Sequence, residues 1–586
     1  MKPNSKIASF FNAIFVNFRH VGVVLKIEKV VKKMAPAEKI LFSVCAATFA
    51  VSALVLLFRV HSSFLVEIPS FGGSFTEGSV GSPRFINPVL AISDTDKDLA
   101  SLVYAGLIKM DDSGAFVPDL AESYEVLEGG TVYYATLKED AYFHDGEKVT
   151  TDDIIFTLNK ITDPTVKSPR AVSWSGVSVE KISDREIRFT LSKSYAPFLE
   201  AMTVGILPKH IWEKASSEEF PFSEFNINPV GSGPYKIKKV VRNGGGIPTS
   251  ITLSAFQNYA LGSPKIKTIN LKFFQNENEL YRAYKDREID SMVGLSPVTA
   301  KKLEQENTLS EESSLPRVFG LFFNQNTATV LLNREVREAL DVSAPKQQIV
   351  DEVLFGFGKP LNGPTPDNVE NNPEMAVGNM EKAKEILSQS GWSPNEEGVL
   401  TKKTKSGTEI LKFAITTSDS PELKSAASIL KETWKNLGAE IDIKVFEAGD
   451  LSQNIIKGRK YDALLFGEVV SNKSDLYPFW HSSERNDPGL NIALYANITA
   501  DKLLEEMRED LNVENEREKR EALVAEIKSD LPAVFLFSPD LLYVRPEKVK
   551  NLSLKNISSP SERFTSIQKW FIETDKVWEI FADRST

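Results

Sequence analysis

The sequence is poor in the residues that most enzymes and metal sites use for their chemistry. Its 586 residues include one cysteine, Cys45, and five histidines. A single cysteine excludes a disulfide within the chain, and no HExxH, clustered Cys/His or EF-hand pattern is present. The GxSxG elbow of hydrolases and the GxxxxGK[ST] loop of nucleotide-binding proteins are also missing. We therefore expect no enzymatic activity, no cofactor and no metal site, and the chain is not itself an ATPase.

The strongest candidate for a catalytic group is the pair His144 and Asp145 in the segment YFHDGEKV. Neighbouring residues on a strand point to opposite faces, so these two side chains cannot act together as an acid–base pair. Asp145 is followed by Gly146, and an Asp-Gly pair is typical of a tight turn. The segment therefore predicts a turn rather than an active site.

Charge is distributed unevenly along the chain. Residues 1–39 carry a net charge of +6, which leaves −17 on the remainder of a chain whose total is −11. An acidic body repels phosphate groups. This argues against a nucleic acid as the partner.

A long uncharged run follows the basic segment. Residues 40–58 contain no charged side chain and are bracketed by Lys39 and Arg59. At about 1.5 Å per residue, the run is long enough for the hydrocarbon core of a bilayer. The basic excess favours a cytoplasmic N-terminus and an extracytoplasmic body, and the run is longer than the core of a cleaved signal peptide. We predict a basic cytoplasmic segment at 1–39, with an interfacial amphipathic helix at 7–30, and an uncleaved transmembrane anchor at 40–58.

The remaining chain alternates short strands with amphipathic helices, which is an α/β pattern. The predicted strands are 132–137, 185–191, 268–274 and 440–446. The predicted helices are 150–162, 378–392 and 421–438, followed by one long charged helical stretch with a solvated face at 499–531.

Many segments of this body match, in order, the motifs of a known family. They begin with LVYAGLIKMDDSGAFVPDLAESYEV at 102–126 and YFHDGEKVTTDDIIFTLNKITDP at 142–164, where an FxDG turn precedes a T-x-D-D helix. They continue with GILPKHIW at 205–212, NPVGSGPYKI at 228–237, RVFGLFFNQN at 317–326, an AxxxLxxSGW helix at 383–392, YDALLFGE at 461–468 and DLYPFWHSS at 475–483. The set resembles the family 5 extracellular solute-binding proteins, which include receptors for oligopeptides, dipeptides and nickel.

The resemblance implies an α/β fold of the periplasmic-binding-protein type, in which two lobes flank a cleft and one lobe carries an extra domain. The implied boundaries are a discontinuous lobe I at 66–92, 230–300 and 535–586, an insert at 93–229 and lobe II at 301–534. The implied function is a monomeric, membrane-anchored receptor that captures a peptide or peptide-like ligand between the lobes for an ABC importer. A ligand sensor remains an alternative, although residues 1–39 are too short to form an output domain.

The candidate ligand-binding residues are of two kinds. Aromatic side chains in polar stretches offer flat apolar contact to varied ligands; these are Trp174, Trp480 and Phe323, the last beside Asn324. Core packing is the competing explanation for each ring, and the one that we favour for the neighbouring Phe322.

The second kind concerns charge. Peptide receptors that resemble this chain place an Asp shortly after the strand corresponding to YDALLFGE, where it pairs with the ligand's α-ammonium group. The nearest equivalents here are Ser471 and Asn472, which are neutral, and Glu468 or Asp475 could substitute. This departure keeps a capped peptide, a sugar or a metal complex open as the ligand.

Overall fold

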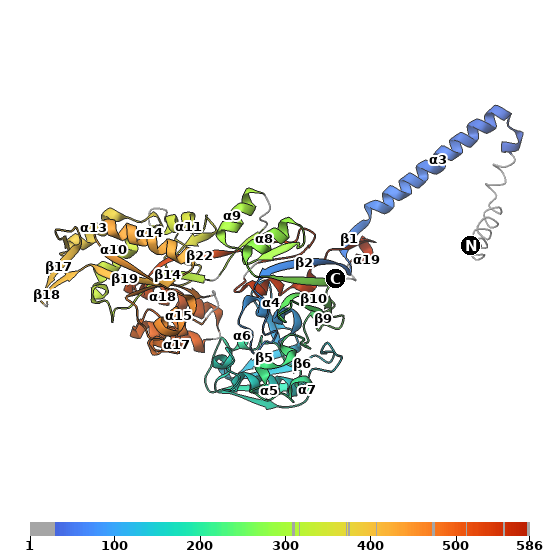
Figure 1. Ribbon diagram of the computed structural model, residues 1–586. Coiled ribbons are helices and arrows are strands. Elements are labelled where there is room, and N and C mark those ends of the chain that lie inside the picture. The colour runs from blue at the N-terminus through green and yellow to red at the C-terminus, as the bar shows by residue number, and fades with distance from the viewer. Residues whose placement is uncertain are drawn as a thin grey trace. The chain divides into compact units, whose positions relative to one another are not determined.

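The structure is a computed structural model that describes residues 30–306, 311–315, 317–370, 372, 376–405, 407–470, 475–510, 512–554 and 557–582. It divides into two compact units, which are Met1–Pro69 with Thr574–Thr586, and Ser70–Glu573 (Figure 1). All but the last residue of the interfacial helix predicted at 7–30 lies outside the described residues, as do Ser471 and Asn472.

The first unit contains the apolar run. Helix α3 (Pro36–Ser63) includes residues 40–58 and begins with a proline, and the carboxylate of Glu38 accepts a hydrogen bond from the Ala35 N–H. Among the described residues, α3 is the one helix long and apolar enough to cross a membrane. Strand β1 (Leu65–Pro69) follows it and pairs antiparallel with β23 (Thr574–Trp578), which leads into α19 (Glu579–Ala582). The segment that follows α3 therefore pairs with a segment more than 500 positions further along the chain.

The second unit is organised around one long strand, β22 (Ala533–Val544). One half of β22 pairs with β14 (Arg317–Phe323), and its far end pairs with β12 (Ser291–Val293). The sheet on the β14 side continues through β21 (Ala463–Val469) to β19 (Lys412–Ser418) and β20 (Glu440–Phe446). On the β12 side it continues through β2 (Gly72–Val80), β11 (Ile266–Phe274), β10 (Pro248–Ala255) and β9 (Tyr235–Arg242). A single strand thus connects two α/β halves.

The residues of the expected insert form a separate antiparallel sheet. Its strand order is β5 (Ala121–Leu127), β6 (Val132–Leu137), β8 (Glu186–Leu191) and β7 (Val177–Lys181). Helix α5 (Thr151–Thr162) starts where the sequence predicts it, because the Asp153 carboxylate accepts hydrogen bonds at 2.8 Å from both the N–H and the hydroxyl of Thr150. This interaction satisfies a free donor at the helix start and places a negative charge there.

Helices cover both faces of the β14–β21 sheet (Figure 1). Leu321 and Phe323 point toward α10 (Arg334–Ser343), α11 (Lys346–Val353), α13 (Met380–Gln389) and α14 (Pro421–Leu437). Val318 and Phe322 point to the opposite face, toward α17 (Ile498–Glu509) and α18 (Val513–Asp530). This alternation follows from the period of two along a strand, and it confirms the prediction that Phe322 packs in the core.

The charged helical stretch predicted at 499–531 consists of two helices, α17 and α18. Asp510 has an extended backbone at the end of α17. The side chain of Asn512 then accepts hydrogen bonds from the N–H groups of Glu514 and Asn515. An Asn side chain in this role starts a new helix, so α18 begins there instead of continuing α17.

Candidate ligand-binding site

A cavity of about 400 Å³, which we call the tyrosine cavity, is lined by residues of the expected insert and of expected lobe II. Its volume is within the range of small-ligand pockets. The insert lines it with two segments, 172–177 and 191–195, that end in Tyr195. Lobe II lines it with Tyr477, Glu505, Arg508 and Glu509. Segments from distant parts of the chain therefore form its opposite walls.

Direct hydrogen bonds connect these walls. The Ala196 N–H donates to the backbone oxygen of Arg508 at 2.8 Å, and the Ser194 hydroxyl donates to the backbone oxygen of Glu509 at 3.0 Å. Both acceptors lie in the last turn of α17, where carbonyl groups lack partners within the helix. The end of α17 thus provides the acceptors that join lobe II to the insert.

Arg508 also organises the side chains at the cavity edge. Its Nε donates to Asp475 Oδ2 at 2.8 Å, and its guanidinium carbon lies 3.6 Å from the centre of the Tyr477 ring. The Tyr195 hydroxyl lies 3.5 Å from the same Asp475 oxygen. Burial and the nearby Asp475 carboxylate raise the pKa of Tyr195 to about 12, so this hydroxyl stays protonated and can donate. Asp475 is therefore held by lobe II itself.

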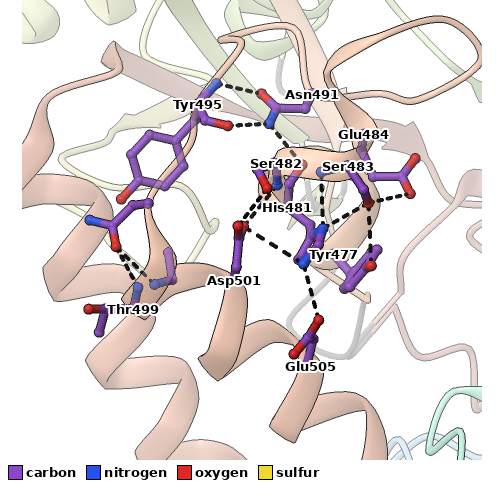
Figure 2. A network of polar contacts seen from close by, with 12 residues as sticks. Tyr477, His481, Ser482, Ser483, Glu484, Asn491, Tyr495, Thr499, Asp501 and Glu505 are labelled. Carbon is purple, nitrogen blue, oxygen red and sulfur yellow. Dashed lines mark hydrogen bonds and ion pairs between the residues drawn. The ribbon is translucent and has the colours of Figure 1, made fainter.

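A polar network supports the lobe II wall from behind (Figure 2). The rings of Tyr477 and His481 stack with their centres 3.9 Å apart, and His481 Nδ1 lies 2.8 Å from the Ser483 hydroxyl. The Ser482 N–H donates to Asp501 on α17 at 2.8 Å, while His481 Nε2 lies 3.6 Å from Glu505. The network therefore fixes the position of Tyr477.

Within the described residues no group of three or more His, Cys, Asp or Glu side chains is arranged to hold a metal.

A second cavity, of about 330 Å³, lies among residues of the insert and of expected lobe I, and we call it the charged cavity. Its charged lining residues are Lys97, Lys109, Asp119, Arg170, Glu200 and Glu562. Lys109 donates to the backbone oxygen of Thr565 at 3.0 Å, and Asp119 accepts from the Tyr259 hydroxyl at 3.0 Å. Its charges are therefore balanced in number, and some of them already have partners.

The sequence resembles known proteins over most of its length. Residues 115–487 match the family described as bacterial extracellular solute-binding proteins, family 5 Middle. The chain belongs to this family. The family 5 protein is 28% identical over 519 residues to the oligopeptide-binding protein AppA of Bacillus subtilis, covering 86% of this chain and 92% of AppA. It is 24% identical over 468 residues to the nickel-binding protein NikA of Staphylococcus aureus, covering 79% of this chain and 88% of NikA.

Solved structures agree with this assignment. The structure of Bacillus subtilis AppA in complex with a nonapeptide has a TM-score of 0.68 and 27% identity, and covers 86% of this chain and 100% of that one. The substrate-binding protein CtaP of Listeria monocytogenes shares the fold, with a TM-score of 0.72, 24% identity, and coverage of 86% and 100%. The expected periplasmic-binding-protein fold is therefore confirmed, while the exact lobe boundaries stay a prediction.

The family 5 protein places the predicted aromatic residues in its core. Trp174 is 3% exposed and packs against Phe198 with ring centres 5.1 Å apart, although its neighbours Ser173 and Ser175 line the tyrosine cavity. Trp480 is 1% exposed, on the side of α16 (Tyr477–Trp480) that faces the core. Packing accounts for both rings, which form the support of the cavity walls rather than their surface.

The other predicted residues are also buried. Phe323 belongs to the core below α14, and the Asn324 side chain donates to the backbone oxygen of Arg459 at 2.9 Å. Glu468 is buried on β21, and burial raises its pKa well above the ordinary range, with an opposing effect from Arg459. Asp475 does not line the tyrosine cavity but contacts Arg508, which does.

Tyr195, Tyr477 and Arg508 were not predicted from the sequence. Tyr477 could have been found by the criterion used for Trp480, since both lie in the polar stretch DLYPFWHSS. Arg508 lies in the charged helical stretch that was interpreted as a solvated face. The role of Arg508 depends on its contacts with the insert, and a local sequence pattern does not reveal contacts between distant segments.

The turn predicted at His144 and Asp145 is confirmed. Gly146 has a φ of +98° and donates to the backbone oxygen of Phe143 at 3.0 Å. His144 is held by the backbone oxygen of Gly233 at 3.0 Å, and burial lowers its pKa to about 4. Asp145 instead contacts His210 at 2.8 Å, so the two neighbours have separate structural partners.

Proposed function

We propose that this family 5 protein is a membrane-anchored, extracytoplasmic receptor that binds a peptide or peptide-like solute between its lobes and delivers it to an ABC importer. Membership of the solute-binding family supports the receptor role. The names of its relatives, among them an oligopeptide-binding protein and a dipeptide-binding protein, support a peptide as the solute. The receptor has no reaction of its own to catalyse and acts by binding and release.

The observation that carries this proposal is the tyrosine cavity, whose opposite walls come from the expected insert and from expected lobe II. Its lining combines hydroxyl groups, as in Ser173 and Ser175, with the rings of Tyr195 and Tyr477. Hydroxyls can hydrogen-bond a peptide backbone, and tyrosine rings contact varied side chains with little loss of rotamer freedom. Closure of the insert onto lobe II would enclose the solute, in the manner of hinge-bending binding proteins.

The anchor is supported by α3. Its apolar run is flanked by the basic segment, which favours a cytoplasmic N-terminus. Protease added to intact cells should then degrade the body and leave the short N-terminal segment protected. Protection of the body until lysis would contradict this topology.

Ligand class is tested with the full chain in detergent. Pools of short peptides should raise its melting temperature, and isothermal titration should give a measurable affinity. Sugars and nickel salts serve as the competing ligands, and a shift with either of these but not with peptides would replace the peptide assignment while keeping the receptor role.

The position of the ligand is tested with a matched pair of variants. Val172 is 86% exposed and lines the tyrosine cavity, whereas Ile182 is exposed outside it. Val172→Trp should fill the cavity and lower peptide affinity about tenfold or more, through a clash with the bound solute. Ile182→Trp should have no effect. Equal affinities for the two variants would place the solute elsewhere.

A further inference from the structure

The charged cavity contains two opposite charges that do not pair. Arg170 donates through Nε to the backbone oxygen of Pro88 at 3.1 Å. Among the residues that the structure describes, neither its two terminal nitrogens nor the Glu200 carboxylate has a hydrogen-bond or ion-pair partner. Both side chains line the same cavity. They are thus close to each other and separated by more than the length of an ion pair.

Both side chains are exposed where they line the cavity. Desolvation by the surrounding protein raises the pKa of Glu200, an effect that Arg170 opposes and the Asp475 carboxylate strengthens. Burial likewise raises the pKa of Glu562, and Glu200 adds to that rise. Accessible charges that line a cavity and have no protein partner can form charge-assisted hydrogen bonds to a bound ligand. A ligand with complementary charges would gain both interactions.

Glu562 is already positioned to take part. Its carboxylate accepts from the Ser558 N–H at 2.7 Å and from the Ser559 hydroxyl at 3.3 Å. These two donors orient the group on the expected lobe I side, while Glu200 comes from the insert. Because Asp475 is engaged by Arg508, it is Glu200 and Glu562, rather than Asp475, that present carboxylates to a cation.

We propose that the charged cavity binds a zwitterionic solute of about the size of an amino acid or dipeptide. Its ammonium group lies at Glu200 with Glu562 nearby, and its carboxylate lies at the terminal nitrogens of Arg170. The cavity volume suits a small ligand, and a separation greater than an ion pair between the two protein charges matches a ligand that carries both charges. The charged cavity is separate from the tyrosine cavity, so this assignment goes beyond the proposed receptor function and adds a second binding site.

The test uses the full chain in detergent, an equimolar dipeptide mixture, and the same mixture with N-acetylated or C-amidated ends. Wild type should bind the unmodified mixture about tenfold or more tightly than either blocked form, because each block removes a charge-assisted hydrogen bond. Glu200→Gln should remove the penalty of acetylation and leave the penalty of amidation, and Arg170→Gln should do the reverse. Glu218→Gln, an exposed carboxylate on the same insert, is the control.

Two outcomes overturn the proposal in different ways. Binding of longer peptides with no binding of dipeptides, or a loss in each variant that is equal for free and blocked forms, would refute the charged cavity as a zwitterion site and leave the receptor function intact. Failure of every peptide and amino acid to bind wild type would refute both.

A second inference concerns the end of the chain. The indole N–H of Trp578 on β23 donates to His61 Nδ1 at 2.9 Å, and its ring stacks near Phe64, with centres 6.3 Å apart. His61 lies three residues beyond Phe58, the last residue of the apolar run, which is about 4.5 Å along the helix axis. The headgroup layer on each side of a bilayer is about 5–8 Å thick. Trp578 therefore lies at the height of that layer when α3 spans the membrane.

We infer that Trp578, Phe64 and the adjoining α19 form a membrane-contacting surface in the headgroup layer of the outer leaflet. Trp578 is 43% exposed, Phe64 is 52% exposed and Ile580 of α19 is 72% exposed. Tryptophan favours this layer because its ring is apolar and its N–H is polar. Continuity with α3 selects lipid as the occupant, so this inference rests on the proposed anchor.

Spin labels on the full chain in phosphatidylcholine–phosphatidylglycerol vesicles test this surface. Ile580→Cys is labelled in a Cys45→Ser background, with Phe222→Cys, which is 84% exposed on the insert, as the aqueous control. The label at 580 should be more accessible to oxygen than to a water-soluble nickel chelate, and the label at 222 the reverse. A label on native Cys45 reports the anchor. Aqueous behaviour at 580 with lipid behaviour at 45 would overturn only this inference, and aqueous behaviour at both would overturn the anchor as well.

Discussion

Two arginines of the second unit lie near carboxylates, but their contacts differ. Arg563 is buried and donates to Glu77 at 2.6 Å through Nη2 and to Asp98 at 2.8 Å through Nη1. Although burial alone would lower the pKa of Arg563, the two carboxylates raise it. Arg170 lines a cavity with Glu200 and pairs with none of the described acidic side chains. We call Arg563 with its paired carboxylates the closed cluster, and the unpaired Arg170 and Glu200 the open cluster.

The difference teaches how burial and pairing assign a charge to stability or to binding. The Glu77 carboxylate also accepts hydrogen bonds from the hydroxyls of Tyr543 at 2.7 Å and Ser291 at 3.1 Å, so its acceptor capacity is used within the core. A buried charge network with every member satisfied fixes a fold. A cavity lined by charges that lack protein partners is instead suited to a ligand that supplies those partners.

The largest effect should come from breaking the closed cluster. Arg563→Met removes one partner and leaves Glu77 and Asp98 buried without compensation, so the free energy of unfolding should fall by about 3–5 kcal/mol. Urea unfolding of the full chain, followed by fluorescence, measures this. Lys272→Met breaks an exposed pair with Glu288 and should cost less than about 1 kcal/mol. Similar losses for the two variants would contradict the distinction.

The second-largest effect tests whether Trp480 stabilises the fold or contacts the ligand. Trp480→Ala removes a buried indole that packs on Phe535 and Tyr495, so we expect a loss of about 3 kcal/mol in stability. Phe222→Ala, at an exposed site, should change stability by less than about 0.5 kcal/mol. If Trp480→Ala kept wild-type stability and lost peptide affinity, the ring would have a direct role in binding.

A smaller effect is expected from Arg508→Ala, because Arg508 both holds a carboxylate in place and lines the tyrosine cavity. It removes the hydrogen bonds to Asp475 and the contact with Tyr477, at a cost of about 1–2 kcal/mol in stability at this partly exposed site. It also frees the Asp475 carboxylate for a ligand. The affinity penalty of N-acetylation should therefore increase severalfold, as titration with free and acetylated peptides would show. An unchanged penalty would mean that Asp475 lies out of reach of the ligand.

The smallest effect is a pH dependence of the open cluster. The pKa of Glu200 is raised above its ordinary value of 4.5, so the folded protein holds this proton to higher pH than the unfolded chain does. Without ligand, stability should decline as pH rises from about 4.5 through the raised pKa. The preference for a free amine should strengthen over the same window, because ionised Glu200 attracts an ammonium group. Titrations at several pH values measure this, and Glu200→Gln should abolish it.

The sequence predicted those elements whose signals are local. Helix α5 follows from a Thr-Asp capping pair, and α14 ends at Gly438, which adopts a φ of +102° that favours glycine. Strand β11 follows from alternation. The family motifs were equally local, and they indicated the fold correctly without giving the contacts between lobes.

The sequence by itself determined the apolar run, the α/β pattern and the family, since each depends on residues that are neighbours along the chain. Only the tertiary structure decided which charges are satisfied. Arg563 and Glu77 are 486 positions apart, and nothing in their local sequences distinguishes Arg563 from Arg170. It also decided that Trp174 and Trp480 pack in the core while Tyr195 and Tyr477 line the cavity. The physical reason is that burial and pairing depend on which faces of distant segments meet, and periodicity specifies a face without specifying its partner.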